Sequence, residues 1–368
     1  MSLLDLFTTP PPVQPIEPLS LSIGPWNQGP AQEVSEFTGG NLQLTLDAGH
    51  QLSFTMPGRS PAARLSDGLT TDCWLYFGEV LLGRFRMLPL SQSWGDSGED
   101  DVTVNAVSYK RLLAWRYLHS ALEFLSHEQG NIVWKLIEHT QAQPGGNLGI
   151  TKGVDTTGVL RDRQYAIGDN VLDLGINLSG VENGCWWDID ANRVYTAKMY
   201  PDFPLHPTPW ELGGNILTLA LTPPSGFANA VMASGDQEAT VPVWVATTGV
   251  SADPRGRWEA VTASPSTIQQ NTLTQHARGY LSRATRPPAV WLAEIEPHRW
   301  RTDSRYQPGD RIVVVIPPTT VDPLNTVEFD TVKAQVTEVS TTFDQHGFLG
   351  VGVTAVEGTA AVPIEETT

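Results

Sequence analysis

Three side chains of a kind that binds metal ions, His119, Glu123 and His127, follow one another at intervals of four residues. The surrounding segment, residues 109–125, has the apolar periodicity of a helix, with Ser108 as a candidate N-cap. A helix would place all three on one face, but metal binding also needs a cavity and a further ligand or water. Because short motifs match readily by chance, we interpret them as a solvated helix face and predict no metal site.

A second candidate is the carboxylate pair Asp188 and Asp190 in the segment CWWDID, residues 185–190, which alternates as a β-strand does. On a strand the two side chains share one face and lie about 6–7 Å apart. Inverting glycoside hydrolases hold their paired carboxylates ~6.5–9.5 Å apart, so this separation is compatible with catalysis. Polar residues on the outer face of a strand are the ordinary case, however, and we predict no catalytic residue.

Other residues with catalytic or binding chemistry are few. The sequence has no G-x-S-x-G, H-E-x-x-H, P-loop or G-x-G-x-x-G motif, and we predict no cofactor. Cys73 and Cys185 lie in apolar segments, which favours buried free thiols, although one bridge between them stays open. The twelve tryptophans are scattered through apolar segments, which is typical of cores and subunit interfaces.

Composition narrows the class of protein. The 368 residues correspond to roughly two or three domains, and the 40% hydrophobic content excludes a disordered chain. The formal net charge of −17 argues against a nucleic-acid binder, since Lys and Arg supply the affinity for phosphates, and it favours solubility instead. No stretch approaches ~20 uninterrupted apolar residues, so we expect no membrane span, and the N-terminus lacks the basic start of a secretory signal.

Helices are expected in the middle of the chain, where apolar residues recur at helical spacing. One covers residues 132–140, with Ser126 and Gln129 as a capping box, and a second covers 169–179. A third begins at Ser264 as N-cap, with a proline at its first position. One stripe of this third helix carries Leu273, Ala277, Leu281 and Ala284.

The two ends of the chain are strand-rich and resemble each other. Residues 48–57 match 308–317, and residues 90–107 match 339–356 in the same order. Each match shares a glycine at a fixed place, and the second also shares an aromatic residue. The short alternating strands and frequent turns favour one β-barrel-like module used twice around an α+β middle.

We therefore expect a mostly β, α+β protein with five parts. They are an extended arm (1–20), a first β-barrel domain (21–108), an α+β middle region of two subdomains (109–288), a second β-barrel domain (289–358) and a flexible tail (359–368).

The order of these segments resembles the tail-hub proteins of long-tailed bacteriophages, also called minor tail proteins, over residues 40–357. The shared pattern begins with an arginine shortly before a tyrosine, here Arg161 or Arg163 with Tyr165. An amphipathic helix follows, and then a strand with glycine, aromatic and acidic residues that ends in a proline turn. The matching positions are Gly184, Trp186, Asp188, Asp190, Pro201 and the PGDRI segment 308–312.

The resemblance implies a structural virion protein with two similar β-barrels flanking α+β domains. Three copies would close a ring that joins the sixfold tail tube to the threefold tail tip and lets DNA pass. Its partners would be further copies of itself, the distal tail protein, the tape measure protein and tail-tip or fibre proteins. It would assemble in the host cytoplasm and reside at the phage tail tip.

Two alternatives remain open, both compatible with a tail tip. One is a cell-wall glycan hydrolase that uses Asp188 and Asp190, and the other is a carbohydrate-binding module that recognises host sugars through exposed tryptophans. In the ring interpretation three copies carry a formal charge of 3 × −17 = −51. We expect carboxylates to outnumber Lys and Arg on the axial face, because an acidic channel repels passing DNA.

Overall fold

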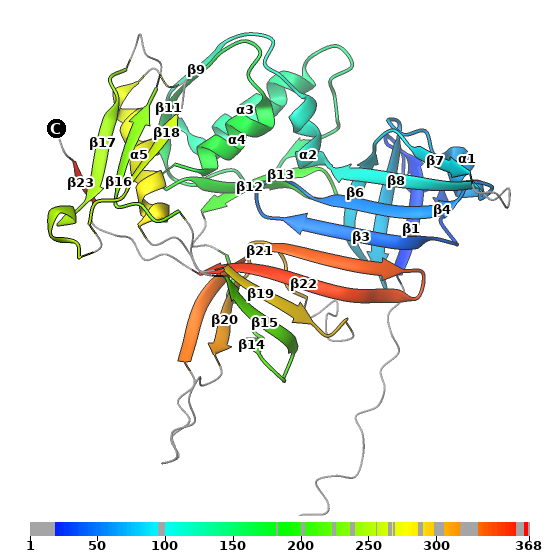
Figure 1. The fold of residues 1–368 in the computed structure, drawn as a ribbon. Helices are drawn as coiled ribbons and strands as arrows, with labels where there is room; N and C mark the ends of the chain where they lie inside the picture. Colours follow the sequence, from blue (N-terminus) through cyan, green and yellow to red (C-terminus); the bar gives the residue numbers. More distant parts are fainter. Residues whose placement is uncertain are drawn as a thin grey trace, which may run out of the picture.

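Strands predominate in the computed structural model of this chain (Figure 1). Pro201, Ser264 and nearly all of the predicted arm lie outside the residues that the structure describes. Within the predicted flexible tail, β23 (Ile364–Glu366) pairs with a strand of the middle region. The described residues are 19–94, 100–181, 183–199, 203–222, 226–235, 240–254, 256–263, 267, 269–285, 290–297, 305–316, 330–357 and 364–366.

Fourteen strands of the described chain form one large curled sheet, which occupies the lower part and the right-hand side of Figure 1. They are β1 (Leu19–Pro25), β2 (Gln32–Glu33), β3 (Thr38–Thr45), β4 (Gln51–Pro57), β5 (Thr71–Phe77), β6 (Val80–Met87), β7 (Ser91–Trp94), β8 (Asp100–Ser108), β14 (Trp210–Glu211), β15 (Ile216–Thr222), β19 (Val290–Ile295), β20 (Arg311–Ile316), β21 (Asp330–Asp344) and β22 (Gly347–Glu357). A short helix, α1 (Pro61–Leu65), follows β4.

Apolar and polar residues alternate along β4 and β8, and burial follows this alternation. Leu52, Phe54 and Met56 on β4 all enter one hydrophobic core, which they share with the apolar side chains of β8. The same core includes residues of the C-terminal strands, such as Val353 on β22. Burial of each large apolar side chain contributes about 1.5–3 kcal/mol, so this shared core holds the two ends of the chain together.

The second block of the predicted repeat is confirmed by strand register. Met87 faces Ala106 where β6 meets β8, and Val336 faces Ala355 where β21 meets β22. Both partners of the second pair lie 249 residues after those of the first (336 − 87 and 355 − 106). Beyond this pair each ladder shifts by one residue. From Ser91 to Ser93, the register of β7 with β8 then equals that of β21 with β22. The combination of β6, β7 and β8 therefore recurs as β21 and β22.

The first block of the predicted repeat, residues 48–57 with 308–317, is wrong. It aligns β4 with β20, but β4 pairs with β8, whereas β20 pairs with the first half of β21. The counterpart of β20 is β5, which pairs with β6 as β20 pairs with β21. The counterpart of β4 is β19, which pairs with β22 as β4 pairs with β8. All these strands alternate in the same way, so a ten-residue match did not distinguish β4 from β5.

Five strands thus recur in the same antiparallel order. The N unit has the order β3-β4-β8-β6-β5, with β7 as the continuation of β6, and the C unit has the order β15-β19-β22-β21-β20. The second half of β21 joins the two units by pairing with β3, from Glu338 facing Thr45 to Phe343 facing Gly40. We call this pairing the seam.

Between the units the chain forms a second core, built from α2 to α4 and five short strands. The elements are α2 (Tyr109–Leu112), the 3-10 helix η2 (Leu113–Trp115), β9 (Leu122–Glu128), α3 (Gln129–Gln141), β10 (Thr151–Lys152), β11 (Leu160–Tyr165), α4 (Val171–Ser179), β12 (Cys185–Ile189) and β13 (Val194–Met199). The helices predicted over 132–140 and 169–179 and the strand over 185–190 are confirmed, each with an apolar face in this core.

The helix predicted over 109–125 is wrong. Only its first two turns are helical, and β9 follows as an antiparallel partner of β11. This pairing links segments some 35 residues apart, which a local periodicity does not detect. The capping box is wrong for the same reason, because Ser126 lies on β9. Glu128 is the N-cap of α3 instead, and its carboxylate accepts a hydrogen bond from the backbone N–H of Asn131.

The buried residues of a third, smaller core lie between β15 and β19 in the sequence. This core packs α5 (Gln270–Ala284) on a sheet of β16 (Ala230–Ser234), β17 (Val243–Thr247), β18 (Glu259–Ala263) and β23. The predicted stripe of α5 is confirmed as buried, but the helix begins at Gln270 with Gln269 as N-cap, not at Ser264. A second 3-10 helix, η4 (Val250–Ala252), follows β17.

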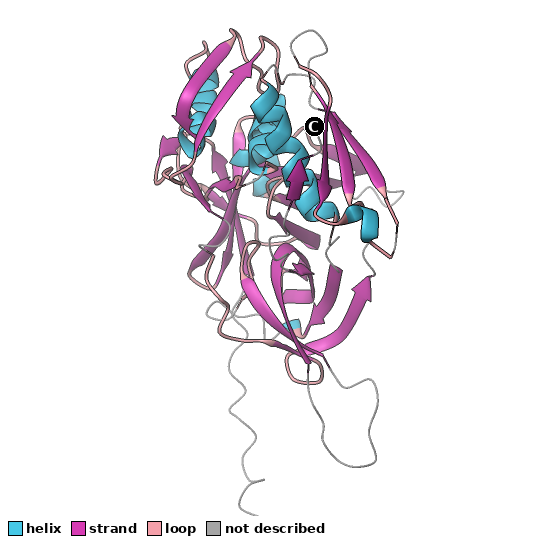
Figure 2. Cartoon of the chain, turned by 90° about the vertical axis from the view of Figure 1, so that its left-hand side faces the viewer, coloured by secondary structure: helices cyan, strands magenta, loops and turns pink. Residues whose placement is uncertain are grey.

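Helices α2 to α5 occupy the upper half of the molecule, away from the C unit (Figure 2). The predicted middle region, 109–288, also contains β14 and β15, but these strands pair with β20 and β19 of the large sheet. No helix in the described chain combines the length and the apolar character needed to cross a membrane.

Gly40 should be intolerant of any side chain, because a Cβ atom there would collide with the ring of Phe343 across the seam. We expect Gly40→Ala to lower the free energy of unfolding by about 1–3 kcal/mol, the usual cost of overpacking a core. Chemical denaturation measures this loss. Gly29→Ala is the matched control, since nothing lies within 4 Å of a Cβ at that position. Equal losses in the two variants would contradict the packing role of Gly40.

Candidate functional site

The three candidate metal ligands do not come together. His119 lies in a bend before β9, where its backbone N–H donates to the imidazole of His139. Glu123 and His127 lie on β9, and the His127 ring hydrogen-bonds Asn131 at 2.7 Å. The described residues contain no group of three or more His, Cys, Asp or Glu side chains arranged to hold a metal ion.

The two candidate catalytic carboxylates have different surroundings. Asp190 lies in the turn after β12, and its Oδ1 accepts hydrogen bonds from the backbone N–H groups of Asn192 and Val194, both at 2.8 Å. Asp188 is half-buried on β12, and its Oδ2 lies 3.7 Å from Nε2 of His50. One carboxylate therefore stabilises a turn while the other faces the N unit, so the two do not flank a common space.

Asp188 belongs to a group of polar side chains at the junction of the N unit and the second core. We call His50, Lys110, Trp186 and Asp188 the junction cluster. Lys110 is buried, and its ammonium donates to the carbonyl oxygens of Trp187 at 2.6 Å and Leu46 at 3.2 Å. The indole of Trp186 donates to the same Leu46 carbonyl at 3.2 Å. These bonds tie β12 to the loop between β3 and β4.

Burial governs the protonation of the junction cluster. It lowers the pKa of His50, partly offset by the nearby Asp188 carboxylate. The neutral imidazole fits the geometry, since His50 Nδ1 accepts a hydrogen bond from the backbone N–H of Thr45 at 3.2 Å. Burial also lowers the pKa of Lys110, again opposed by Asp188. One oxygen of Asp188, Oδ1, is buried and has no hydrogen-bond partner among the described residues.

A cavity of about 260 Å³ lies beside the junction cluster, where three parts of the chain meet. His50 comes from the N unit, Asp188 and Lys198 from the second core, and Arg305 and Asp310 from the segment before β20. Lys198 lies over the ring of Phe203, with its ammonium 3.8 Å from the ring centre. Burial raises the pKa of Asp310. This mixture of opposite charges stabilises contacts between the parts rather than presenting one sign of charge to a ligand.

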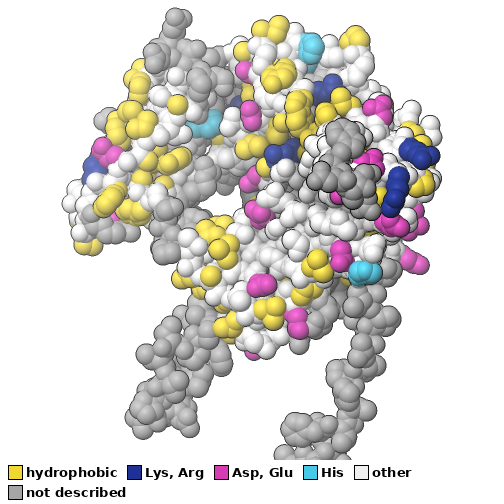
Figure 3. Space-filling model, turned by 45° about the vertical axis from the view of Figure 1, so that its right-hand side comes forward, with side chains coloured by type: hydrophobic (Ala, Val, Ile, Leu, Met, Phe, Trp, Pro, Cys, Tyr) yellow, Lys and Arg dark blue, Asp and Glu magenta, His cyan; other side chains and the backbone are white. Residues whose placement is uncertain are grey.

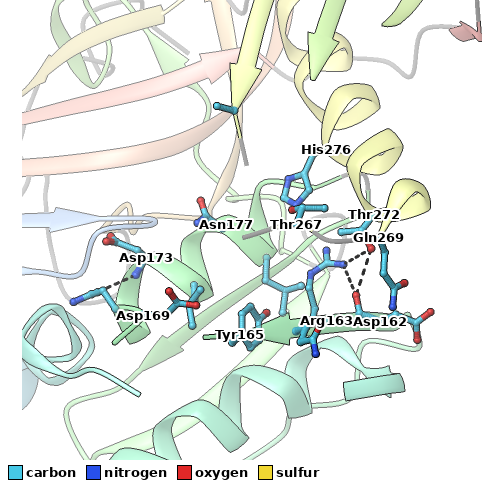
Figure 4. Close-up of a pocket in the computed structure, with 15 residues that line it drawn as sticks. Asp162, Arg163, Tyr165, Asp169, Asp173, Asn177, Thr267, Gln269, Thr272 and His276 are labelled. Carbon is cyan, nitrogen blue, oxygen red and sulfur yellow. Dashed lines mark hydrogen bonds between the residues drawn. The ribbon is translucent and has the colours of Figure 1, made fainter. Parts of the chain in front are cut away.

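A second cavity, of about 280 Å³, separates the second core from α5 (Figure 4). Arg163 crosses from β11 toward Thr272 on α5, and its Nη1 donates to that hydroxyl at 3.4 Å and to the Asp162 carbonyl at 2.8 Å. Arg161, two residues earlier on β11, donates through Nη1 to Gln275 of α5 at 2.8 Å. Tyr165 is buried beside them, and burial raises its pKa to about 12.

Three residues of the family pattern, Arg161, Arg163 and Tyr165, have structural roles on β11. Arg161, Arg163 and Tyr165 alternate along β11, so all three side chains project from one face of that strand. The two arginines bind α5 to the second core, and Tyr165 belongs to that core, with its ring centre 6.1 Å from that of Phe124. Arg163 is more than nine-tenths buried, and the apolar surroundings lower the pKa of its guanidinium.

Sequence patterns did not reveal the junction residues His50 and Lys110, or the buried group around Asp72. Asp72 accepts hydrogen bonds from Arg84 and Arg86, each at 2.7 Å, and from the Tyr109 hydroxyl at 2.6 Å. The arginines lie on β6, which pairs with the Asp72 strand β5, and Tyr109 lies on α2. The free thiols are as expected, because Cys73 and Cys185 are both buried and unbridged.

Solved structures provide the informative comparisons for this chain. Its sequence matches no protein-family model and no curated protein. The 43 kDa tail protein of prophage MuSo2 from Shewanella oneidensis superposes with a TM-score of 0.61 and 11% identity, over 92% of this chain and 98% of that one. Prophage tail protein gp18 of Listeria monocytogenes gives a TM-score of 0.59 and 11% identity, over 93% and 95%.

A third similar structure comes from a secretion system. The Escherichia coli c3393 protein, a component of the type VI secretion system described as similar to the T4 tail proteins gp27 and gp5, gives a TM-score of 0.52. Its identity is 12%, over 90% of this chain and 76% of that one. At these identities the comparisons establish the fold alone, and this chain has the mostly β, curled-sheet fold of phage tail proteins.

The lowered pKa of His50 predicts that the protein loses stability in mild acid. The unfolded chain takes up a proton near the ordinary histidine pKa of about 6.5, whereas the folded chain resists it. Stability should therefore fall as the pH drops below about 6.5, at no more than ~1.4 kcal/mol per pH unit for one proton. Denaturant unfolding of wild type and His50→Gln at several pH values measures the difference. An unchanged slope in His50→Gln would assign the effect to other groups.

Proposed function

We propose that this chain is a structural tail-hub protein of a bacteriophage virion. Three copies form a ring that joins the sixfold tail tube to the threefold tail tip and lets DNA pass. The observation that carries the proposal is the recurrence of five strands in one order within a single chain, with a shared register where β6 and β7 meet β8 and where β21 meets β22. Three such chains supply six similar units around an axis, which matches a threefold partner on one side and a sixfold partner on the other.

The proposal includes the division of the chain into two similar β-barrel domains around an α+β middle. The N unit and C unit are the centres of these barrels, and we assign β14 and β15 to the second barrel because of their pairing. The second and third cores are the two middle subdomains. Of the middle, only the third core is inserted within the C unit, between β15 and β19.

The proposed partners are further copies of the chain, the distal tail protein, the tape measure protein and the tail-tip or fibre proteins. The charge of the chain suits the passage of DNA, because acidic surfaces repel phosphates. On the face shown in Figure 3, Asp and Glu side chains are spread widely, whereas Lys and Arg gather in a few places. We propose that carboxylates also outnumber basic residues on the axial face of the ring.

A tail hub should be threefold in the assembled particle. We expect electron microscopy of tails that contain this chain to show three copies at the junction of tube and tip. The mass of the purified chain in solution is a second measurement, although a monomer alone is compatible with assembly on partner proteins. A stable, catalytically active monomer that is absent from particles would overturn the proposal.

The rival function, cleavage of cell-wall glycans, makes a separate prediction. Asp188 faces a cavity, but Asp190 is committed to a turn, so we expect no clearing of bacterial cell walls by the purified chain. Zymography with wild type and Asp188→Asn measures this. Clearing by wild type that disappears in Asp188→Asn would favour the hydrolase over the structural function.

A further inference from the structure

Among the described strands of the two units, β7 and β15 each have one edge without a partner, β7 in the N unit and β15 in the C unit. β15 is the last strand of the large sheet and pairs only with β19, while β7 pairs only with β8. Neither strand contains a charged residue or a proline, the usual means by which proteins protect such edges from association. These edges therefore resemble surfaces that another strand covers.

The repeat identifies which strand that is. β7 is the counterpart of the second half of β21, because both have the same register with the following strand. β15 is the counterpart of β3, because each pairs with the next strand of its unit and shifts by one residue near its start. Within the chain, the second half of β21 pairs with β3 at the seam. The free edges of β7 and β15 are thus the two halves of a second seam.

Burial supports this equivalence. Leu42 on β3 faces Leu52 on β4 and is fully buried beneath the seam. Its counterpart Leu221 on β15 faces the buried Trp291 on β19, yet it is 52% exposed. Both leucines lie on the core side of their sheet. In the described chain no strand continues the sheet beyond β15, and an added strand would cover Leu221.

We infer that β7 of a second copy of this chain adds to β15 as an antiparallel strand. The seam gives the register: Thr342 faces Asn41 there, and the equivalent pair is Ser93 of one copy with Ala220 of the next. The neighbouring pairs are Ser91 with Thr222, Gln92 with Leu221 and Trp94 with Leu219. This contact is heterologous, since each copy offers β7 on one side and β15 on the other. The inference rests on the proposed ring, because a series of heterologous contacts ends only when the copies close into a ring.

Cysteines placed in this register test the inference in assembled tails. Ser93 and Ala220 are exposed, and partners in an antiparallel pair have Cα atoms about 4.5–5.5 Å apart, within the range that a disulfide spans. Tails assembled with Ser93→Cys plus Ala220→Cys should give a covalent trimer on a non-reducing gel after mild oxidation. The native Cys73 and Cys185 are buried and should contribute no bridge, as wild-type tails will show.

The matched control moves one cysteine two residues along β15. Ser93→Cys with Thr218→Cys also uses exposed positions, but its cysteines are too far apart to bridge in the inferred register. Ser91→Cys with Thr222→Cys is a second in-register pair for use if the first disturbs assembly. Covalent trimer from an in-register pair but not from the control supports the inference. If the tails are threefold but no in-register pair gives a covalent trimer, the inferred pairing of β7 with β15 is wrong and the hub function stands. If the tails are not threefold, both the inferred pairing and the hub function are wrong.

Discussion

The pairing of β21 with β3 is the constraint on which the rest of this architecture depends. One strand serves two units, since its first half completes the C unit beside β20 and its second half extends the N unit. The pairing merges the two interiors, with the ring of Phe343 packed 5.9 Å from that of Phe37. At the surface of the seam, Gln43 donates to Glu338 at 2.8 Å. Main-chain ladder, core and surface contacts thus fix the same register.

Because the units are fixed by long-range pairing, the chain can leave the sheet and return without disturbing it. β3 and β4 are joined by a short turn, whereas their counterparts β15 and β19 are separated by the whole third core. Lengthening a loop costs little free energy, which permits such an insertion. The third core is also fixed to its surroundings, since Arg161 and Arg163 hydrogen-bond α5 to the second core. The junction cluster likewise binds the second core to the N unit through Lys110.

The sequence revealed features that depend on neighbours in the chain and missed those that depend on distant partners. The stripes of α3, α4 and α5 and the alternation of β4 and β8 were predictable because one buried face imposes a period. The second block of the repeat was predictable because a β-hairpin brings its strands together locally. The strand β9 and the true counterpart of β4 were not, since each depends on pairing between remote segments. The contact of His50 with Asp188, 138 residues later, left no local pattern at all.

Placing both units in one chain has a consequence for how a ring of this kind closes. Half of its contacts between units would be seams inside chains, formed during folding at the high effective concentration that a covalent link provides. The other half would form only when copies meet, with residues that have diverged: Phe343 faces a glycine at the seam, whereas its counterpart Trp94 would face Leu219. The two kinds of contact need not be equally strong. Such a ring keeps six similar units while its true symmetry is threefold, so each of its faces is free to suit a different partner.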